Sequence, residues 1–267
     1  MQSLRVLQWN ILAKKLALPN WFPMTDPQHL KWDYRKTQII AQLQTIQADL
    51  LCLQEVDEYP FFCDVLSNYG STFASKYPLH SKSRSKLLDG SAIFYRKDRF
   101  RMLKSSHFRY SEDQAQTALF AKFECLRSKK CFYVATTHLK SGSGDENEEI
   151  RQKQVQILLK YLTLYTQEDP TAPVLICGDL NAKLGSNVHT EFGTYSSIWN
   201  QSQLSNVYTV NVGNAEGGAF REVLDYIYFS PQSLSLHKLS INLPNESLPN
   251  DLHPSDHLPI VATFGLI

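Results

Sequence analysis

Strand-like apolar runs that end in short polar motifs recur along the whole chain. Runs such as Leu50–Leu53 and Val174–Cys177 carry no polar side chain, so a strand built from either must be covered on both faces. Six polar motifs lie at the ends of such runs: Gln8-Trp9-Asn10, Leu53-Gln54-Glu55-Val56, Thr137-His138-Leu139-Lys140, Gly178-Asp179-Leu180-Asn181, Leu224-Asp225-Tyr226 and Ser255-Asp256-His257. We therefore expect other elements to cover both faces of these apolar strands, and the polar motifs at the strand ends to gather at one edge.

Strands recur throughout, and helices are interspersed among them without strict alternation. The expected strands span residues 4–9, 48–56, 91–95, 101–110, 117–126, 131–139, 173–177, 223–229 and 258–264. The expected helices span 33–47, with Asp33 as N-cap, 60–69, closed by Gly70, and 146–165. This order predicts an α/β (α+β) fold, a four-layer α/β/β/α sandwich in which two mixed β-sheets pack face to face with helices outside. A (β/α)₈ barrel would need strict alternation.

Composition narrows the class of protein. Hydrophobic residues make up 43% of the chain, which supports a large core, and no Ser/Gly/Pro-rich linker divides residues 1–267, so we expect a single domain. No run of about 18 apolar residues predicts a transmembrane helix, and the N-terminus enters a strand without a secretory signal. We therefore expect a cytoplasmic monomer with no membrane partner. The five cysteines form no CxxC pair and are expected to be free thiols.

Charge is distributed unevenly along a nearly neutral chain. The net charge of +1 does not by itself attract nucleic acid. The stretch from Lys76 to Lys104 nevertheless holds nine Lys or Arg residues against two Asp. It is either a solvated surface or a rim that steers phosphate groups, and the sequence leaves both interpretations open.

Several polar motifs supply oxygen atoms where strands end. Glu55 follows the apolar run Leu50–Leu53, and a carboxylate there is costly unless it is paired or binds a metal. Together with Asn10, which closes the first strand, it could offer oxygen ligands to a hard cation such as Mg²⁺ or Mn²⁺. Asp179 and Asn181 are two residues apart, so in an extended chain they point the same way. The Asp can orient or deprotonate water, while the Asn can donate to a phosphoryl oxygen.

Other motifs supply cations for phosphate. A carboxylate such as Asp225 can fix the tautomer of His257 and favour its cationic form, which can then bind a phosphate group. His138 and Lys140 could contact the phosphate from another side. Each motif alone also has a plain structural explanation, such as a turn residue or a solvated Lys. Their combination predicts a metal-dependent phosphoesterase.

The same motifs resemble a known superfamily. The strings Leu7 to Ala13 (LQWNILA) and Leu51 to Asp57 (LCLQEVD), with Asp89-Gly90, Thr137 to Lys140 and Pro254 to Leu258, are similar to those of the endonuclease/exonuclease/phosphatase superfamily, which has the deoxyribonuclease-I-like fold. The finer resemblance is to its deadenylase-related branch, and within that branch to the nocturnin group. It covers nearly the whole chain.

The resemblance implies a role for each site residue. Glu55 would be the principal Mg²⁺ ligand, with Asn10 adjacent and Asp256 near the metal. Asp179 would handle the attacking water, and Asn181 would stabilise the transition state. The phosphate would be held by His257, oriented by Asp225, and by His138, Lys140 and Lys76.

The resemblance also limits the substrate to two main classes. The first interpretation is a 3′–5′ exoribonuclease of deadenylase type, acting on the 3′ end of RNA. The second is a phosphatase that removes the 2′-phosphate of an adenine dinucleotide, NADP(H). Gly142 stands where the nocturnin group has an Arg, and no obvious Arg lies in 211–219, which favours RNA. A third, from another class, is a non-catalytic RNA-binding module, which would release no product.

Overall fold

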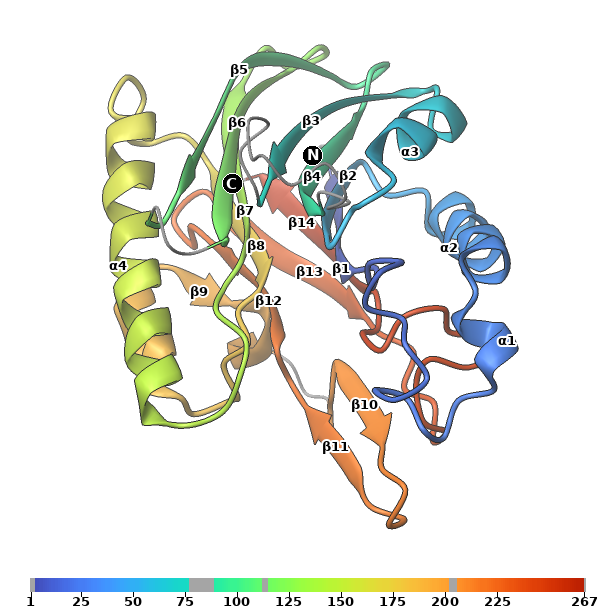
Figure 1. The fold of residues 1–267 in the computed structure, drawn as a ribbon. Helices are drawn as coiled ribbons and strands as arrows, with labels where there is room; N and C mark the ends of the chain where they lie inside the picture. Colours follow the sequence, from blue (N-terminus) through green and yellow to red (C-terminus); the bar gives the residue numbers. More distant parts are fainter. Residues whose placement is uncertain (1–2, 77–88, 112–114, 202–205, 267) are drawn as a thin grey trace.

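Two mixed β-sheets packed face to face form the centre of the molecule (Figure 1). The structure is a computed structural model, which describes residues 3–76, 89–111, 115–201 and 206–266. The first sheet has the order β13-β14-β1-β2-β4-β3. Its strands are β1 (Ser3–Asn10), β2 (Leu50–Gln54), β3 (Tyr69–Ser75), β4 (Gly90–Arg96), β13 (Leu234–Ser240) and β14 (Ile260–Leu266). Only β1 and β2 are parallel neighbours among these strands.

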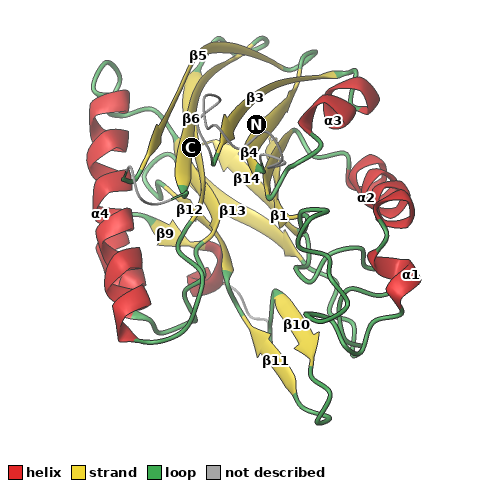
Figure 2. Ribbon diagram, viewed as in Figure 1, coloured by secondary structure: helices red, strands yellow, loops and turns green. Residues whose placement is uncertain are grey.

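The second sheet has the order β5-β6-β7-β8-β12-β9. Its strands are β5 (Phe100–Arg109), β6 (Thr117–Cys125), β7 (Cys131–His138), β8 (Val174–Asp179), β9 (Ser196–Ser197) and β12 (Asp225–Phe229). Its described strands pair antiparallel except for β7 and β8, which are parallel. A separate hairpin of β10 (Val210–Gly213) and β11 (Ala219–Glu222) projects below both sheets (Figure 2).

Helices cover both outer faces of the sandwich. The helices α1 (Pro27–Leu30), α2 (Trp32–Ile46) and α3 (Tyr59–Val65) lie on the side of the first sheet, and α4 (Asp145–Thr166) lies on the side of the second (Figure 1). Two short 3-10 helices, η1 (Asn187–Phe192) and η2 (Ile198–Gln201), complete the described elements. No described helix combines the length and apolar character needed to cross a lipid bilayer. The expected four-layer sandwich is confirmed.

Alternation along the buried strands explains the layers. On β2, Leu50 and Cys52 belong to the core between the sheets, whereas Leu51 and Leu53 pack with Ile39 of α2 on the outer face. Successive side chains of a strand point to opposite faces, so a fully apolar strand needs two partners. Burying one Leu side chain contributes about 1.5–3 kcal/mol to the free energy of unfolding. The strand β2 buries leucines on both of its faces.

Strand and helix bounds differ from the prediction by a few residues, and two predicted helix caps are wrong. The helix expected over 60–69 ends at Val65, and Tyr69 and Gly70 already belong to β3. Gly70 lies in β3 and so does not close the helix; a Cβ there would meet the ring of Tyr95 on the neighbouring strand, which would have to shift. Asp33 is not the N-cap: α2 starts after Lys31, and Asp33 lies in its first turn, where a negative charge still favours the helix dipole.

The basic stretch from Lys76 to Lys104 is only partly described, since residues 77–88 lie outside the described ranges. Among its described members, Arg96, Arg99 and Arg101 each form an ion pair with a carboxylate. These three arginines belong to the far end of β4 and the start of β5, whereas the polar motifs lie at the other end of β4. For these three arginines, the ion pairs agree with the interpretation as a surface and not with a rim that steers phosphate.

Candidate active site

The strand order brings the polar motifs to one edge of the two sheets. Asn10 ends β1 beside the end of its parallel neighbour β2, and Glu55 follows β2 directly. In the second sheet, Asp179 ends β8 directly opposite His138 of β7 and Asp225 of β12. Parallel neighbours end at the same edge, and the antiparallel strand β12 begins there. Residues far apart in the chain therefore meet.

An amide from the first sheet links carboxylates from both sheets. Asn10 Nδ2 donates to Glu55 Oε1 at 3.2 Å and to Asp179 Oδ2 at 3.0 Å. The Asn10 side-chain oxygen accepts from the backbone N–H of Leu12 at 3.1 Å, and Glu55 Oε2 accepts from that of Ala13 at 2.8 Å. Asn10 therefore acts here as a donor that orients two buried carboxylates.

Backbone strain is concentrated in the same region. Leu12, Glu55 and Asn181 have φ values of 58°, 57° and 50°, in the left-handed region that residues other than glycine adopt uncommonly. Such residues cost about 1–3 kcal/mol each and persist where their surroundings hold them. The N–H of Asn181, for example, donates to Asp179 Oδ1 at 3.0 Å. Strain of this kind is typical of functional sites.

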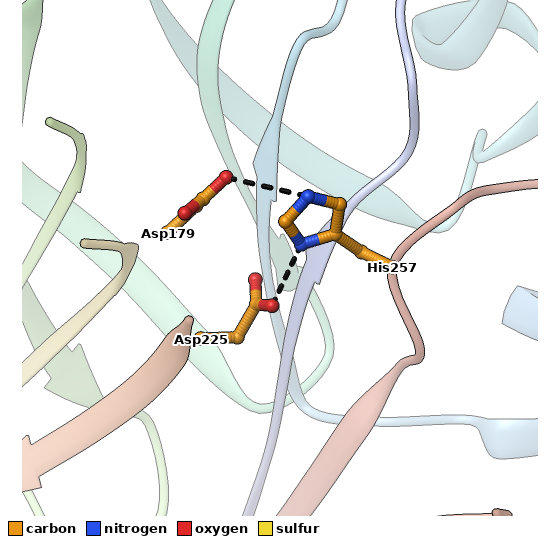
Figure 3. Close-up of side chains that lie close together, drawn as sticks. All are labelled: Asp179, Asp225 and His257. Atoms are coloured by element: carbon orange, nitrogen blue, oxygen red, sulfur yellow. Dashed lines mark hydrogen bonds and ion pairs between the residues drawn. The ribbon is translucent and has the colours of Figure 1, made fainter. Parts of the chain in front are cut away.

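His257 lies between two aspartates (Figure 3). Its Nδ1 is 2.7 Å from Asp225 Oδ2, and its Nε2 is 3.6 Å from Asp179 Oδ2. Burial alone would lower the pKa of His257, but the charges of Asp225 and Asp179 outweigh it and raise the pKa well above its ordinary value. The imidazole is therefore cationic, with Asp225 fixing one nitrogen and the other facing the site.

His138 has the opposite electrostatic surroundings. Its Nε2 is 3.4 Å from Asp179 Oδ2, but burial and the positive charge of Lys76 lower its pKa to about 4. Lys76 itself forms an ion pair with Asp89, with 2.6 Å between Nζ and Oδ2. The site therefore holds one neutral and one cationic imidazole, a separation that suits different chemical roles.

The carboxylates fit a divalent cation. Burial raises the pKa of Asp256 to about 6 against the opposing charge of His257, and the charges of Glu55 and Asp179 raise it further, so these carboxylates repel one another. A hard cation with oxygen ligands relieves such repulsion. Asp179, Asp225 and His257 also offer ligand atoms within 4.8 Å of one another. Asp225 and His257 already bond to each other within this group, at 2.7 Å.

The loop after β7 carries Lys140 beside Asn181. Asn181 Nδ2 donates to the carbonyl oxygen of Leu139 at 3.1 Å. Helix α4 holds the same loop at Lys140. Gln154 accepts from the N–H of Lys140 at 2.9 Å, and Arg151 donates to the carbonyl oxygen of Lys140 at 3.0 Å. These contacts fix the backbone of the Lys140 loop beside the end of β8.

A groove of about 770 Å³ opens from Asn181 along this loop. Its lining includes Gly142, Lys183, Phe220 and Leu224. Phe220 is 46% exposed, and Lys183 Nζ lies 5.4 Å from the centre of its ring. The groove therefore offers an aromatic side chain next to Asn181, with Lys183 paired to Glu222 at 2.5 Å beside it.

Sequence reasoning missed one buried cation that organises the edge. The guanidinium of Arg35 is fully buried and donates to the carbonyl oxygens of Ile11, Leu12 and Pro254 at 3.0, 2.6 and 2.7 Å. It joins the segments that follow β1 and precede His257. A signal was present, because Arg35 falls four residues before Ile39 on the apolar face of α2, where a solvated Arg would not be expected.

Comparison with known proteins agrees with this geometry. The chain is 34% identical to mouse nocturnin over 98% of its own length, and it spans 65% of the length of that relative. It is 29% identical, again over 98% of its length, to the CCR4-Not complex 3′-5′-exoribonuclease subunit Ccr4 of Saccharomyces cerevisiae, of which it covers 39%. The solved human nocturnin catalytic domain with bound sulfate matches with a TM-score of 0.80 and 31% identity, over 99% of this chain and 95% of that one.

A family model covers the same motifs. The model described as Endonuclease/Exonuclease/phosphatase family matches residues 7–257, which include every polar motif from Gln8 to His257. Buried carboxylates, a cationic His257 and strained site residues at the shared edge of two sheets are thus found in a chain that this model matches almost throughout. The chain belongs to the Endonuclease/Exonuclease/phosphatase family.

Proposed function

We propose that this protein is a metal-dependent hydrolase of nucleotide phosphoesters and that it acts on the 3′ ends of RNA as a 3′–5′ exoribonuclease. The observation that carries the proposal is the position of the His257 imidazole, 2.7 Å from Asp225 and 3.6 Å from Asp179, in a site whose carboxylates Glu55, Asp179 and Asp256 act on one another. Phosphoester hydrolysis needs neutralisation of phosphoryl charge and an activated water. This arrangement of groups can supply both.

Each side chain at the edge has a role in the proposal. Glu55 and Asp256 would hold Mg²⁺, or Mn²⁺ in its place, which when bound neutralises charge on a phosphoryl oxygen. Asn10 keeps Glu55 and Asp179 in position. Asp179 accepts a proton from the attacking water, and His257 donates its Nε2–H to a phosphoryl oxygen.

The remaining residues would complete the phosphate site. Asn181 donates to the oxygen that gains charge in the transition state. His138 is neutral, so it serves as a hydrogen-bonding group and not as a second cation. Lys140 and Lys76 would contribute the positive charges that hold the substrate phosphate.

The groove beside Asn181 supports a nucleotide substrate. Phe220 offers an exposed ring on which a base can stack, a contact worth about 1–3 kcal/mol per base. The name of the yeast relative describes a 3′-5′-exoribonuclease, which agrees with an RNA substrate.

An NADP(H) 2′-phosphatase is the second candidate, motivated by the higher identity to nocturnin than to the yeast enzyme. A second phosphate dianion calls for a bidentate Arg. Gly142 supplies none, and its φ of 104° strains any replacement. Arg221 is engaged with Asn211 Oδ1 and the carbonyl oxygen of Asn245. These contacts favour RNA over the dinucleotide.

A substrate panel tests the proposal. Purified protein is incubated with Mg²⁺ and, separately, with poly(A), mixed-sequence RNA, single-stranded DNA, NADP and RNA ending in a cyclic phosphate. We expect nucleoside 5′-monophosphates from RNA with a free 3′-OH, and slower release of phosphate from NADP. If NADP is hydrolysed efficiently and poly(A) stays intact, the 2′-phosphatase replaces the exoribonuclease as the proposed function. If no substrate gives any product, the remaining interpretation is a non-catalytic RNA-binding module.

The Glu55→Gln variant tests the metal assignment in the same panel. It keeps the shape of the side chain and removes its charge, so turnover should fall by more than about a hundredfold while the unfolding transition persists. The matched control is Glu58→Gln, which removes a carboxylate paired with Lys14 near the surface and should leave turnover unchanged. Near wild-type turnover of Glu55→Gln at saturating Mg²⁺ contradicts the assignment.

A further inference from the structure

Asp89 is a buried carboxylate that meets two lysines beside the site. It is 2% exposed. Lys15 Nζ lies 2.5 Å from its Oδ1, and Lys76 Nζ lies 2.6 Å from its Oδ2. The Lys76 side chain is 12% exposed, and that of Lys15 is 29% exposed. One negative charge thus holds two positive charges, and the three groups together keep a surplus of one positive charge.

The backbone fixes Asp89 between two strand ends. Its carbonyl oxygen accepts from the N–H of Lys76, which follows β3, at 3.0 Å. The next residue, Gly90, exchanges two backbone hydrogen bonds with Val56, at 3.0 and 3.1 Å, and Val56 directly follows Glu55. A Cβ at Gly90 would overlap the carbonyl of Ala74, so this close approach requires glycine. Asp89 is therefore held in place beside the segment that carries Glu55.

Three carboxylates act on the ammonium group of Lys76. Burial lowers the pKa of Lys76, but the charges of Asp89, Glu55 and Asp179 outweigh this effect and raise it. Lys76 therefore stays charged in a buried position. An ammonium group without Asp89 would be drawn towards Glu55 and Asp179, the remaining negative charges, because a buried charge needs a partner.

We propose that Asp89, itself held by Lys15, is a positioning residue that keeps the ammonium group of Lys76 away from Glu55 and Asp179 and directed to a substrate phosphate. This inference rests on the proposed function, since it concerns the phosphate of the same site. Asp89 acts through the two lysines and does not itself contact the phosphate, which it would repel. Asp89 fixes the positions of two flexible lysine side chains, although its own negative charge reduces the positive charge near the phosphate.

The two effects of Asp89 predict opposite results for Asp89→Asn. If the carboxylate only neutralised the lysines, its removal would strengthen phosphate binding. If it positions them, its removal lets Lys76 turn to Glu55 and Asp179, and phosphate binding weakens. Loss of one charge-assisted hydrogen bond weakens binding by about tenfold or more. The sign of the change therefore separates positioning from neutralisation.

The experiment compares wild type, Asp89→Asn, Lys76→Met and the double variant. The dissociation constant of inorganic phosphate is measured by calorimetry, and kcat and KM are measured on oligo(A). We expect Asp89→Asn and Lys76→Met each to weaken phosphate binding by about tenfold, with the double variant no weaker than Lys76→Met because both act through one group. Unchanged or tighter binding of phosphate by Asp89→Asn, or additive losses, would overturn the proposal.

Matched controls keep the test sharp. Asp98→Asn removes a carboxylate just beyond the other end of β4, where its exposed side chain pairs with Arg96, and should bind phosphate as wild type does. If Asp89→Asn does not fold, Lys15→Met takes its place and should weaken phosphate binding by about threefold or more, whereas Lys14→Met should not. Equal behaviour of these two variants contradicts the proposal. Phosphate binding needs no turnover, so a failure of the proposed hydrolase activity remains distinguishable.

Discussion

At the scale of single residues, His257 depends on Asp225 for both orientation and charge. The two side chains are joined by a 2.7 Å contact and are separated by 32 positions in the chain. Gln8 in turn donates to the other oxygen of Asp225 at 3.3 Å. A carboxylate held in this way keeps the imidazole in one tautomer and keeps it protonated. His257 and Asp225 therefore form one functional unit.

We expect Asp225→Asn and His257→Ala each to lower kcat/KM on RNA by about a hundredfold or more, because either change removes the oriented cation. The double variant should be no worse than the poorer single variant. The measurement is a double-mutant cycle of kcat/KM. His253→Ala is the control, since that histidine bonds to Asn250 outside the site. Losses that add in the double variant would contradict a coupled pair.

At the scale of elements, the start of helix α4 holds the loop that carries Lys140. The buried guanidinium of Arg151 donates to the carbonyl oxygens of Lys140 and Gly142 at 3.0 and 2.8 Å and pairs with Glu148 at 2.8 Å. Glu148 also accepts from Ser186, another residue that lines the groove. Arg151 and Glu148 therefore connect two segments that line the groove to one helix.

The Arg151→Lys variant keeps the charge but loses the planar fork that reaches several acceptors. We expect kcat/KM to fall by about tenfold, which corresponds to the loss of about one charge-assisted hydrogen bond. Backbone amides of 139–144 should exchange hydrogen for deuterium faster in this variant. Lys153→Met, an exposed change on the same helix, should alter neither quantity. Unchanged exchange in 139–144 would show that Arg151 does not hold the loop.

At the scale of the whole molecule, buried histidines link stability to pH. His189 of η1 bonds through Nδ1 to the hydroxyl of Tyr228 on β12, and through Nε2 to the carbonyl oxygen of Lys183. Burial lowers the pKa of His189 below its ordinary value of 6.5. The unfolded chain then binds a proton at a higher pH than the folded chain does, so acid favours unfolding.

We therefore expect the contribution of His189 to the free energy of unfolding to be complete above pH 6.5 and to fall as the pH decreases through the lowered pKa. Urea unfolding of wild type and His189→Gln from pH 7.5 to 5 measures it. The stability advantage of the wild type should shrink towards low pH. His237→Gln, on the exposed side of β13, is the control. An advantage that stays constant, or grows in acid, would contradict the burial of a neutral ring.

Local sequence determined the elements with a continuous apolar signal. The run Val174–Cys177 forms β8, and the amphipathic pattern of 146–165 forms α4. The strands β3, β13 and the hairpin β10–β11 were not predicted from the sequence. The strand β13 lies at the edge of its sheet and is mostly exposed or half-buried, and β11 is exposed. Such strands form because a neighbouring strand supplies hydrogen bonds, which no apolar periodicity records.

The sequence by itself also determined which residue types end the buried strands, and so pointed to Glu55, Asp179 and His257. Only the tertiary structure decided their partners and charges. Asp89 meets Lys15 across 74 positions, and the opposite pKa shifts of His138 and His257 come from burial and from charges on other strands. Electrostatic energy depends on distance and burial in space, and neither quantity is contained in the spacing along the chain.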